Sequence, residues 1–125
     1  MAEKPVLQPG PNHPITVTPN PARIVVTVAG KVVADTRNAL TLQESTYPPV
    51  QYIPLTDVDE SLLERTSTES YCPFKGEATY YSIPAGAPKS VDAIWTYHQP
   101  HDAVAVIKDH VAFYPDRVDA IEIQD

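Results

Sequence analysis

Hydrophobic and polar residues alternate along much of the chain after residue 22, which is the pattern of half-buried β-strands. Residues 23–28 are rich in β-branched side chains, and a turn at residues 29–31 leads into residues 32–36, which predicts a β-hairpin. The same kinds of pattern predict further short strands over residues 39–44, 50–53, 77–83, 91–97 and 118–123. We therefore expect six or seven strands that pack as sheet on sheet.

Two segments have a different hydrophobic period and are predicted to form short helices. Over residues 56–65 acidic side chains come first, and Asp57 with Glu60 resembles a capping box at a helix N-terminus. A second short helix, capped by Asp102, is predicted to run through Val104, Ile107 and Val111. The predicted fold class is mainly β, with a minor helical part.

The first 21 residues are interpreted as a proline-rich N-terminal arm, followed by a single domain over residues 22–125. Six prolines between residues 5 and 21 remove backbone donors and favour extended geometry. Within this arm Ile15 and Val17 alternate with polar residues, and they could add a short edge strand to the body.

Composition excludes several classes of function. The chain of 125 residues carries a formal net charge of −7, so it lacks the excess of Lys and Arg that binds a nucleic-acid backbone. One cysteine excludes an internal disulfide and a multi-thiolate zinc site. No apolar run reaches the length of a membrane span, and no signal-peptide core follows Met1. We expect a cytoplasmic monomer or homodimer without a nucleic-acid or membrane partner.

The segment around Cys72 and Lys75 is the first candidate for chemistry. A thiol and an ammonium three residues apart could face each other across a turn, and the positive charge would favour the nucleophilic thiolate. These two residues are the candidate catalytic pair. The alternative is a buried cysteine that acts as a small hydrophobic residue, with Pro73 and Gly76 shaping the turn.

Aromatic residues form the second candidate. Trp95 and Tyr97 share one face of a predicted strand, and Tyr80 or Tyr81 could lie across from them. Such a wall could line a small-ligand pocket, or the rings could fill the core of a small sandwich. The wider cluster consists of Tyr80, Tyr81, Trp95, Tyr97, Phe113 and Tyr114.

Charged residues offer a third candidate. Arg37 and Glu44, together with Asp116 and Arg117, could form a charge network, in which arginine would suit a planar anion. Metal binding is poorly supported. The acids at residues 57–60 are explained by a helix N-terminus, and the histidines at 98 and 101 lack a second ligand pair. We expect no metal and no cofactor.

Several motifs, in order and at the expected spacing, resemble the domain of unknown function 427 family. The most specific is Tyr71-Cys72-Pro73-Phe74-Lys75-Gly76, and the resemblance covers about residues 22–122. The other matching segments are residues 23–35, 37–40, Glu44, 49–54, 93–97 and 111–118.

This resemblance implies a small bacterial protein with a β-tent-like fold, in which two antiparallel sheets meet at a steep angle. Relatives of that fold hold zinc with four cysteines, so the zinc would be absent here. The family is sometimes labelled a nucleotidyltransferase domain, but the chain has no glycine-rich phosphate loop. The motif positions in this sequence are Arg37, Glu44, Tyr52, Cys72, Lys75, Tyr80, Trp95, Tyr97 and Asp116.

Three functions are compatible with these residues. The leading hypothesis is a domain that binds a small ligand, with an anion or a nucleotide among the options, in a pocket with aromatic walls. Its ligand-binding residues would be Arg37, Glu44, Tyr52, Tyr80, Trp95, Tyr97 and Asp116. The alternatives are an enzyme that uses Cys72 as a nucleophile or redox thiol, and a protein-interaction module with an exchangeable N-terminal strand.

Overall fold

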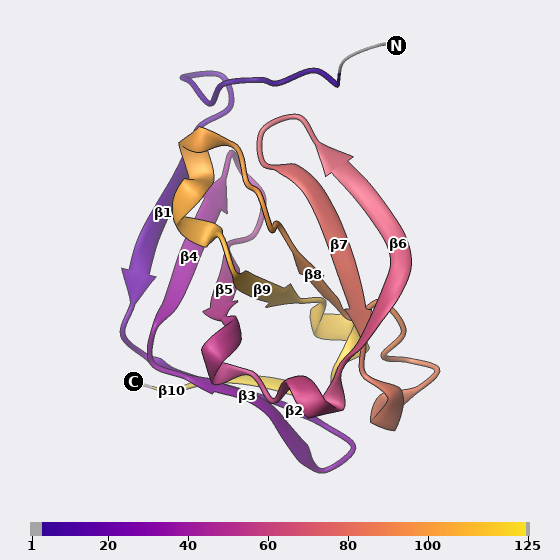
Figure 1. Cartoon of the computed structure of the whole chain (residues 1–125). Helices are drawn as coiled ribbons and strands as arrows, with labels where there is room; N and C mark the ends of the chain where they lie inside the picture. Colours follow the sequence, from indigo (N-terminus) through magenta and orange to yellow (C-terminus); the bar gives the residue numbers. More distant parts are fainter. Residues whose placement is uncertain (1–3, 125) are drawn as a thin grey trace.

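Two antiparallel sheets make up the computed structural model, which describes residues 4–124 (Figure 1). The larger sheet has seven strands in the order β1-β4-β5-β9-β8-β7-β6, and the smaller has three in the order β10-β2-β3. The strands are β1 (Ile15–Asn20), β2 (Arg23–Val28), β3 (Lys31–Thr36), β4 (Ala39–Glu44), β5 (Val50–Pro54), β6 (Glu64–Cys72), β7 (Gly76–Ser82), β8 (Ile94–Thr96), β9 (His110–Phe113) and β10 (Ala120–Gln124).

The hairpin of β2 and β3 follows directly from local sequence. Ile24, Val26 and Val28 alternate with less buried residues and point into the core. Val28 pairs with Lys31, so the loop contains only Ala29 and Gly30, and both have positive φ angles (52° and 76°). Positive φ at both positions is what a two-residue hairpin turn requires.

The two predicted short helices are 3₁₀ turns rather than regular helices. Residues 56–65 contain η1 (Leu55–Asp57) and η2 (Glu60–Leu62), and β6 begins at Glu64. Val58, between the two turns, bridges to Ala34, and this pairing with β3 prevents one continuous helix. The remaining 3₁₀ turns are η3 (Pro84–Gly86), η4 (Asp102–Ile107) and η5 (Pro115–Arg117).

The caps and limits of these turns also differ from expectation. Asp59, and not Asp57, caps η2, since its carboxylate accepts from the Ser61 amide at 3.1 Å. Asp57 instead accepts from the Thr36 hydroxyl at 2.6 Å. The N-cap of η4 is His101, and Asp102 is the first residue of the turn. The turn is kinked at Val104 and ends before residue 111, which belongs to β9 because it pairs with β5 and β8.

Strand β6 has no hydrophobic alternation and was not predicted. It lies at the edge of the seven-stranded sheet, where most of its side chains are exposed on both faces. Backbone pairing with β7 forms the strand. Conversely, the strand predicted over residues 91–97 is limited to Ile94–Thr96, because Asp92 has a φ of +52° and accepts from the hydroxyls of Thr66 and Thr68.

Both faces of the seven-stranded sheet are covered. One face packs against the three-stranded sheet through Ile24, Ile53 and Ile94. The opposite face packs against η4, with Tyr52 and Ile107 in its core. Neighbouring residues of the central strands therefore belong to different cores, as alternation along a strand requires.

The N-terminal arm is docked on the body. Residues Ile15–Asn20 form β1, which pairs with β4 at the sheet edge, as the alternation of Ile15 and Val17 predicts. The preceding segment crosses the turn between β6 and β7 (Figure 1). There the Leu7 amide donates to the Pro73 carbonyl at 2.9 Å, and the Tyr71 hydroxyl donates to the Pro5 carbonyl at 2.6 Å. Among residues 4–124, no helix is long and apolar enough to cross a membrane.

Candidate functional site

An apolar groove of about 800 Å³ lies between the two sheets. Residues of β2 and β10 line it from the smaller sheet, and residues of β5, β8 and β9 line it from the larger. None of the described residues that line it carries a charge. The lining residues are Ile24, Val26, Tyr47, Pro48, Pro49, Val50, Gln51, Ile53, Trp95, Phe113, Tyr114, Pro115, Ile121 and Ile123.

The groove lies where two neighbouring strands part. β5 and β9 pair only through Ile53 with Val111 and Pro54 with His110. Beyond this point the rest of β5 pairs with β4, and the rest of β9 pairs with β8. The two strands are therefore not paired with each other there, and Gln51 of β5 and Phe113 of β9 line the groove.

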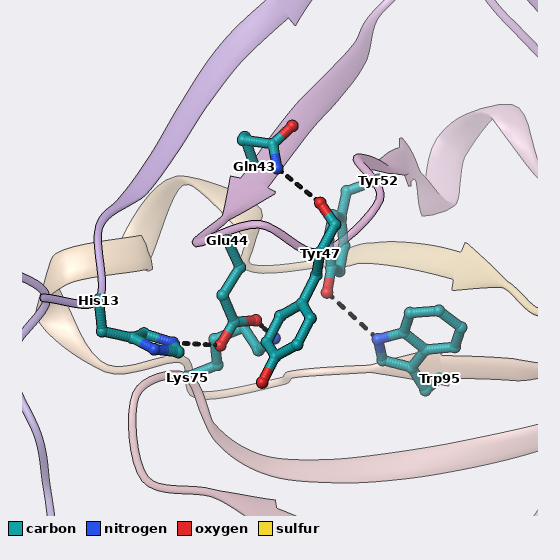
Figure 2. Close-up of polar contacts among 7 residues, drawn as sticks. All are labelled: His13, Gln43, Glu44, Tyr47, Tyr52, Lys75 and Trp95. Atoms are coloured by element: carbon teal, nitrogen blue, oxygen red, sulfur yellow. Dashed lines mark hydrogen bonds and ion pairs between the residues drawn. The ribbon is translucent and has the colours of Figure 1, made fainter.

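Trp95 connects the groove with the core on the other face of the sheet. Its indole nitrogen donates to the Tyr52 hydroxyl at 3.2 Å (Figure 2). The Tyr52 ring is perpendicular to the indole, with centroids 6.3 Å apart, and the Tyr114 ring lies 4.5 Å away at a tilt of 45°. Only Trp95 and Tyr114 of these three line the groove.

The tyrosines near Trp95 stay protonated over the physiological range. Burial raises the pKa of Tyr52 strongly, although the indole donor partly opposes this effect. Burial and the neighbouring Tyr80 hydroxyl raise the pKa of Tyr114 to about 12. Burial also raises the pKa of Tyr97. These hydroxyls are therefore neutral groups that can donate a hydrogen bond.

A separate ion pair joins the end of β4 to the turn between β6 and β7. The Lys75 ammonium donates to one Glu44 carboxylate oxygen at 2.6 Å, and His13 contacts the other at 2.8 Å (Figure 2). The Lys75 and Glu44 side chains are each 13% exposed. Burial favours the protonated acid, but the hydrogen bonds from Lys75 and His13 outweigh it and hold the pKa of Glu44 below its usual value.

The N-terminal arm completes this ion-pair site. His13 lies parallel to the Phe74 ring, with centroids 4.0 Å apart. The other side of the Lys75 ammonium faces Tyr97, whose ring centroid is 6.0 Å away. Cys72 is half-buried and packs against the core that contains Tyr97. The β6–β7 turn thus brings together four of the predicted site residues, Glu44, Cys72, Lys75 and Tyr97.

The remaining predicted site residues lie apart from this ion pair. Tyr80 contacts the Ser70 hydroxyl at 2.7 Å, on the side of the sheet edge formed by β6. Arg37 is exposed between β3 and β4, at the opposite end of β4 from Glu44. Asp116 is exposed in η5, next to Tyr114. The predicted residues are therefore divided among several places, and of the ligand-binding set only Trp95 lines the apolar groove.

Sequence reasoning did not identify several residues of these sites. His13 is far from Glu44 in the chain, and no local pattern links them. Tyr47, Ile121 and Ile123 line the groove, but their sequence segments predict only a loop and a strand. The signal that marks Ile123 as a candidate for binding is an apolar side chain that is 53% exposed, and this exposure is known only from the structure.

The fold and its sites define a mainly β domain with an apolar groove between two antiparallel sheets. Among residues 4–124, no group of three or more His, Cys, Asp or Glu side chains could hold a metal ion. The chain belongs to the family described as a domain of unknown function (DUF427), whose model matches residues 16–124. This match confirms the resemblance seen in the sequence motifs. No curated protein matches the chain significantly.

Proposed function

We propose that this domain binds a small molecule with an apolar ring or chain in the groove between its two sheets. The observation that supports the proposal is the lining of the groove, which is aromatic and aliphatic and carries no charge among the described residues. A volume of about 800 Å³ suits a metabolite-sized ligand. Apolar surface left open to water in this way is typical of binding sites.

The lining also favours a particular kind of ligand. The Trp95 N–H is already used by Tyr52, and the Gln51 side-chain oxygen accepts from Asn20 and Thr41. Polar recognition inside the groove would therefore fall to the Gln51 amide nitrogen and to the hydroxyls of Tyr47 and Tyr114. A buried charge on the ligand would find no opposite charge in the lining, and its desolvation would oppose binding. An anionic group of the ligand would therefore lie outside the groove.

The contacts of Lys75 support a thiol-based enzyme less well. Its ammonium donates to Glu44 at 2.6 Å, so the charge that would favour a Cys72 thiolate is neutralised by a carboxylate. The docked arm similarly gives no specific support to an interaction module with an exchangeable strand, because β1 pairs with β4 over all six of its residues.

Binding can be tested through Trp95, which is the only tryptophan of the chain. Its indole N–H gives a single signal in a ¹H–¹⁵N correlation spectrum, next to the groove. We expect benzyl alcohol or decanoate to shift this signal saturably, and benzyl alcohol to raise the melting temperature, whereas AMP should leave the indole signal unchanged. If neither benzyl alcohol nor decanoate moves the indole signal, the proposal is wrong.

A matched pair of variants locates the binding. Ile123 lines the groove and is 53% exposed, whereas Val91 is 50% exposed and lies outside it. Ile123→Glu places a charge in the groove and should weaken binding of the probe about tenfold or more. Val91→Glu should leave the affinity unchanged. Equal affinities for the two variants would show that the probe binds elsewhere.

A further inference from the structure

A second pocket, of about 380 Å³, lies where the N-terminal arm meets the hairpin of β6 and β7. In contrast to the apolar groove, its lining is polar. Lys4 from the arm, Tyr71 from β6 and Glu77 from β7 form one part of the wall. Thr79 of β7 and the two histidines His98 and His101, which precede η4, form another.

Three buried polar atoms of this wall have no hydrogen-bond partner within residues 4–124. They are the Thr79 hydroxyl oxygen, Nε2 of His98 and Nδ1 of His101. Buried polar atoms without partners are uncommon, because each loses its hydrogen bonds to water and gains none in return. These are the only three such side-chain atoms in the described part of the chain, and all three residues line the same pocket.

We propose that this pocket binds a small oxyanion, such as a phosphate or a carboxylate group. After a rotation of its side chain toward the pocket, the Thr79 hydroxyl can donate a hydrogen bond, and each imidazole can donate from the nitrogen that now lacks a partner. The Lys4 ammonium at the rim is paired with Glu77 but keeps further N–H donors.

Other ligand classes fit the same wall less well. A metal ion would need a third strong ligand, and no group of three His, Cys, Asp or Glu side chains is close enough among residues 4–124. An organic cation would need a free carboxylate, but Glu77 is paired with Lys4. The Thr79 hydroxyl and the unpartnered nitrogens of His98 and His101 can all serve as donors, which suits an acceptor-rich anion.

The proposal is tested on the intact 125-residue chain by imidazole NMR. The four histidines, His13, His98, His101 and His110, provide separate ring signals. Titration with inorganic phosphate, sulfate or acetate at constant ionic strength and neutral pH should shift the His98 and His101 signals saturably. His110 is the internal control, because its Nδ1 contacts the Lys108 carbonyl and it does not line the pocket.

The three probes also distinguish the source of the oxyanion. A preference for phosphate and sulfate over acetate would indicate a tetrahedral group, and the reverse preference would indicate a carboxylate. The proposal is overturned if no probe shifts His98 and His101, or if His110 shifts in parallel with them. It is also overturned if Zn²⁺ shifts both signals while the three oxyanions do not.

A variant pair tests the donors directly. Thr79→Val removes the hydroxyl with little change of shape, and Thr46→Val does the same at an exposed position. Thr79→Val should weaken oxyanion binding by about tenfold, whereas Thr46→Val should not change it. If the Thr79→Val protein is more stable but binds the oxyanion equally well, the Thr79 hydroxyl does not contact the oxyanion, and that part of the proposal is wrong. If that variant does not fold, the wild-type titration still decides the proposal.

Discussion

The indole nitrogen of Trp95 donates to the hydroxyl of Tyr52 over 3.2 Å, and both residues belong to the core on the face of the seven-stranded sheet that packs against η4. Tyr52 is fully buried in the core beside η4, whereas the Trp95 ring also lines the groove between the sheets. A ligand in the groove would thus contact a ring whose orientation is held by a buried partner. This arrangement makes Trp95 both a structural residue and a reporter of binding.

Replacing Trp95 with Phe should destabilise the domain by about 2 kcal/mol, because a large buried contact is reduced and the Tyr52 hydroxyl loses its donor. Urea denaturation followed by far-ultraviolet circular dichroism measures this change without the tryptophan signal. Tyr52→Phe and the double variant complete a mutant cycle. The two residues should show a coupling energy of about 1 kcal/mol, and additive effects would contradict a functioning hydrogen bond.

Lys75→Met should lower the free energy of unfolding by about 2 kcal/mol, since it leaves the Glu44 carboxylate largely buried with only His13 as a partner. The matched control is Lys89→Met, which breaks the exposed pair of Lys89 with Asp119. That change should have little effect, because water already solvates both groups. Similar losses for the two variants in urea denaturation would argue against burial as the cause.

Stability should fall in acid partly through Glu44. The pKa of Glu44 is lower in the folded protein than its usual value of about 4.5, so the unfolded chain takes up this proton first as the pH drops. The contribution of the ionised group is therefore complete above about pH 4.5 and is lost below it. Wild type should be more stable than Glu44→Gln at neutral pH, and this difference should shrink as the pH falls below that value. A difference that stays constant down to the acid transition would contradict the predicted linkage.

Gly86→Ala should destabilise the domain by about 2 kcal/mol through overpacking. An added Cβ would collide with the Ser90 hydroxyl and with a methyl group of Val28, which belongs to the core of β2. Gly10→Ala is the control, because nothing lies within 4 Å of the Cβ at that position. Thermal unfolding of the two variants measures the difference, and an unchanged melting temperature for Gly86→Ala would show that the turn η3 relaxes.

The strands that sequence reasoning located are rich in β-branched residues or alternate between apolar and polar residue types. β2 follows this pattern most clearly, since its burial alternates over all six residues. β6 lacks this signal because its pairing with β7 is made by the backbone. An acidic first turn is common to α-helices and 3₁₀ turns, so the sequence does not distinguish them over residues 56–65. The bridge between Val58 and Ala34, which separates the two turns, joins residues that are distant in the chain.

The candidate site was predictable only in part. The family motif places Cys72, Lys75 and Glu44 on a short list, and the structure joins Lys75 to Glu44. The separation of Arg37 from Glu44 follows from the length of β4, which lies between them. The presence of His13 in the cluster depends on the pairing of β1 with β4, in which Ile15 lies opposite Glu44. This pairing joins segments that are distant in the chain, so the local pattern of either strand does not reveal it.

The sequence by itself determined the mainly β class, the family and the residues with unusual chemistry, because alternation, turn residues and motifs are local properties of the chain. Only the tertiary structure decided how these residues divide between an apolar groove, a buried ion pair and a polar pocket. A strand presents neighbouring residues to opposite faces, and the strands that meet across a sheet come from distant parts of the chain. Trp95 in β8 and His98 in the loop that follows are only three residues apart, yet they line two different pockets.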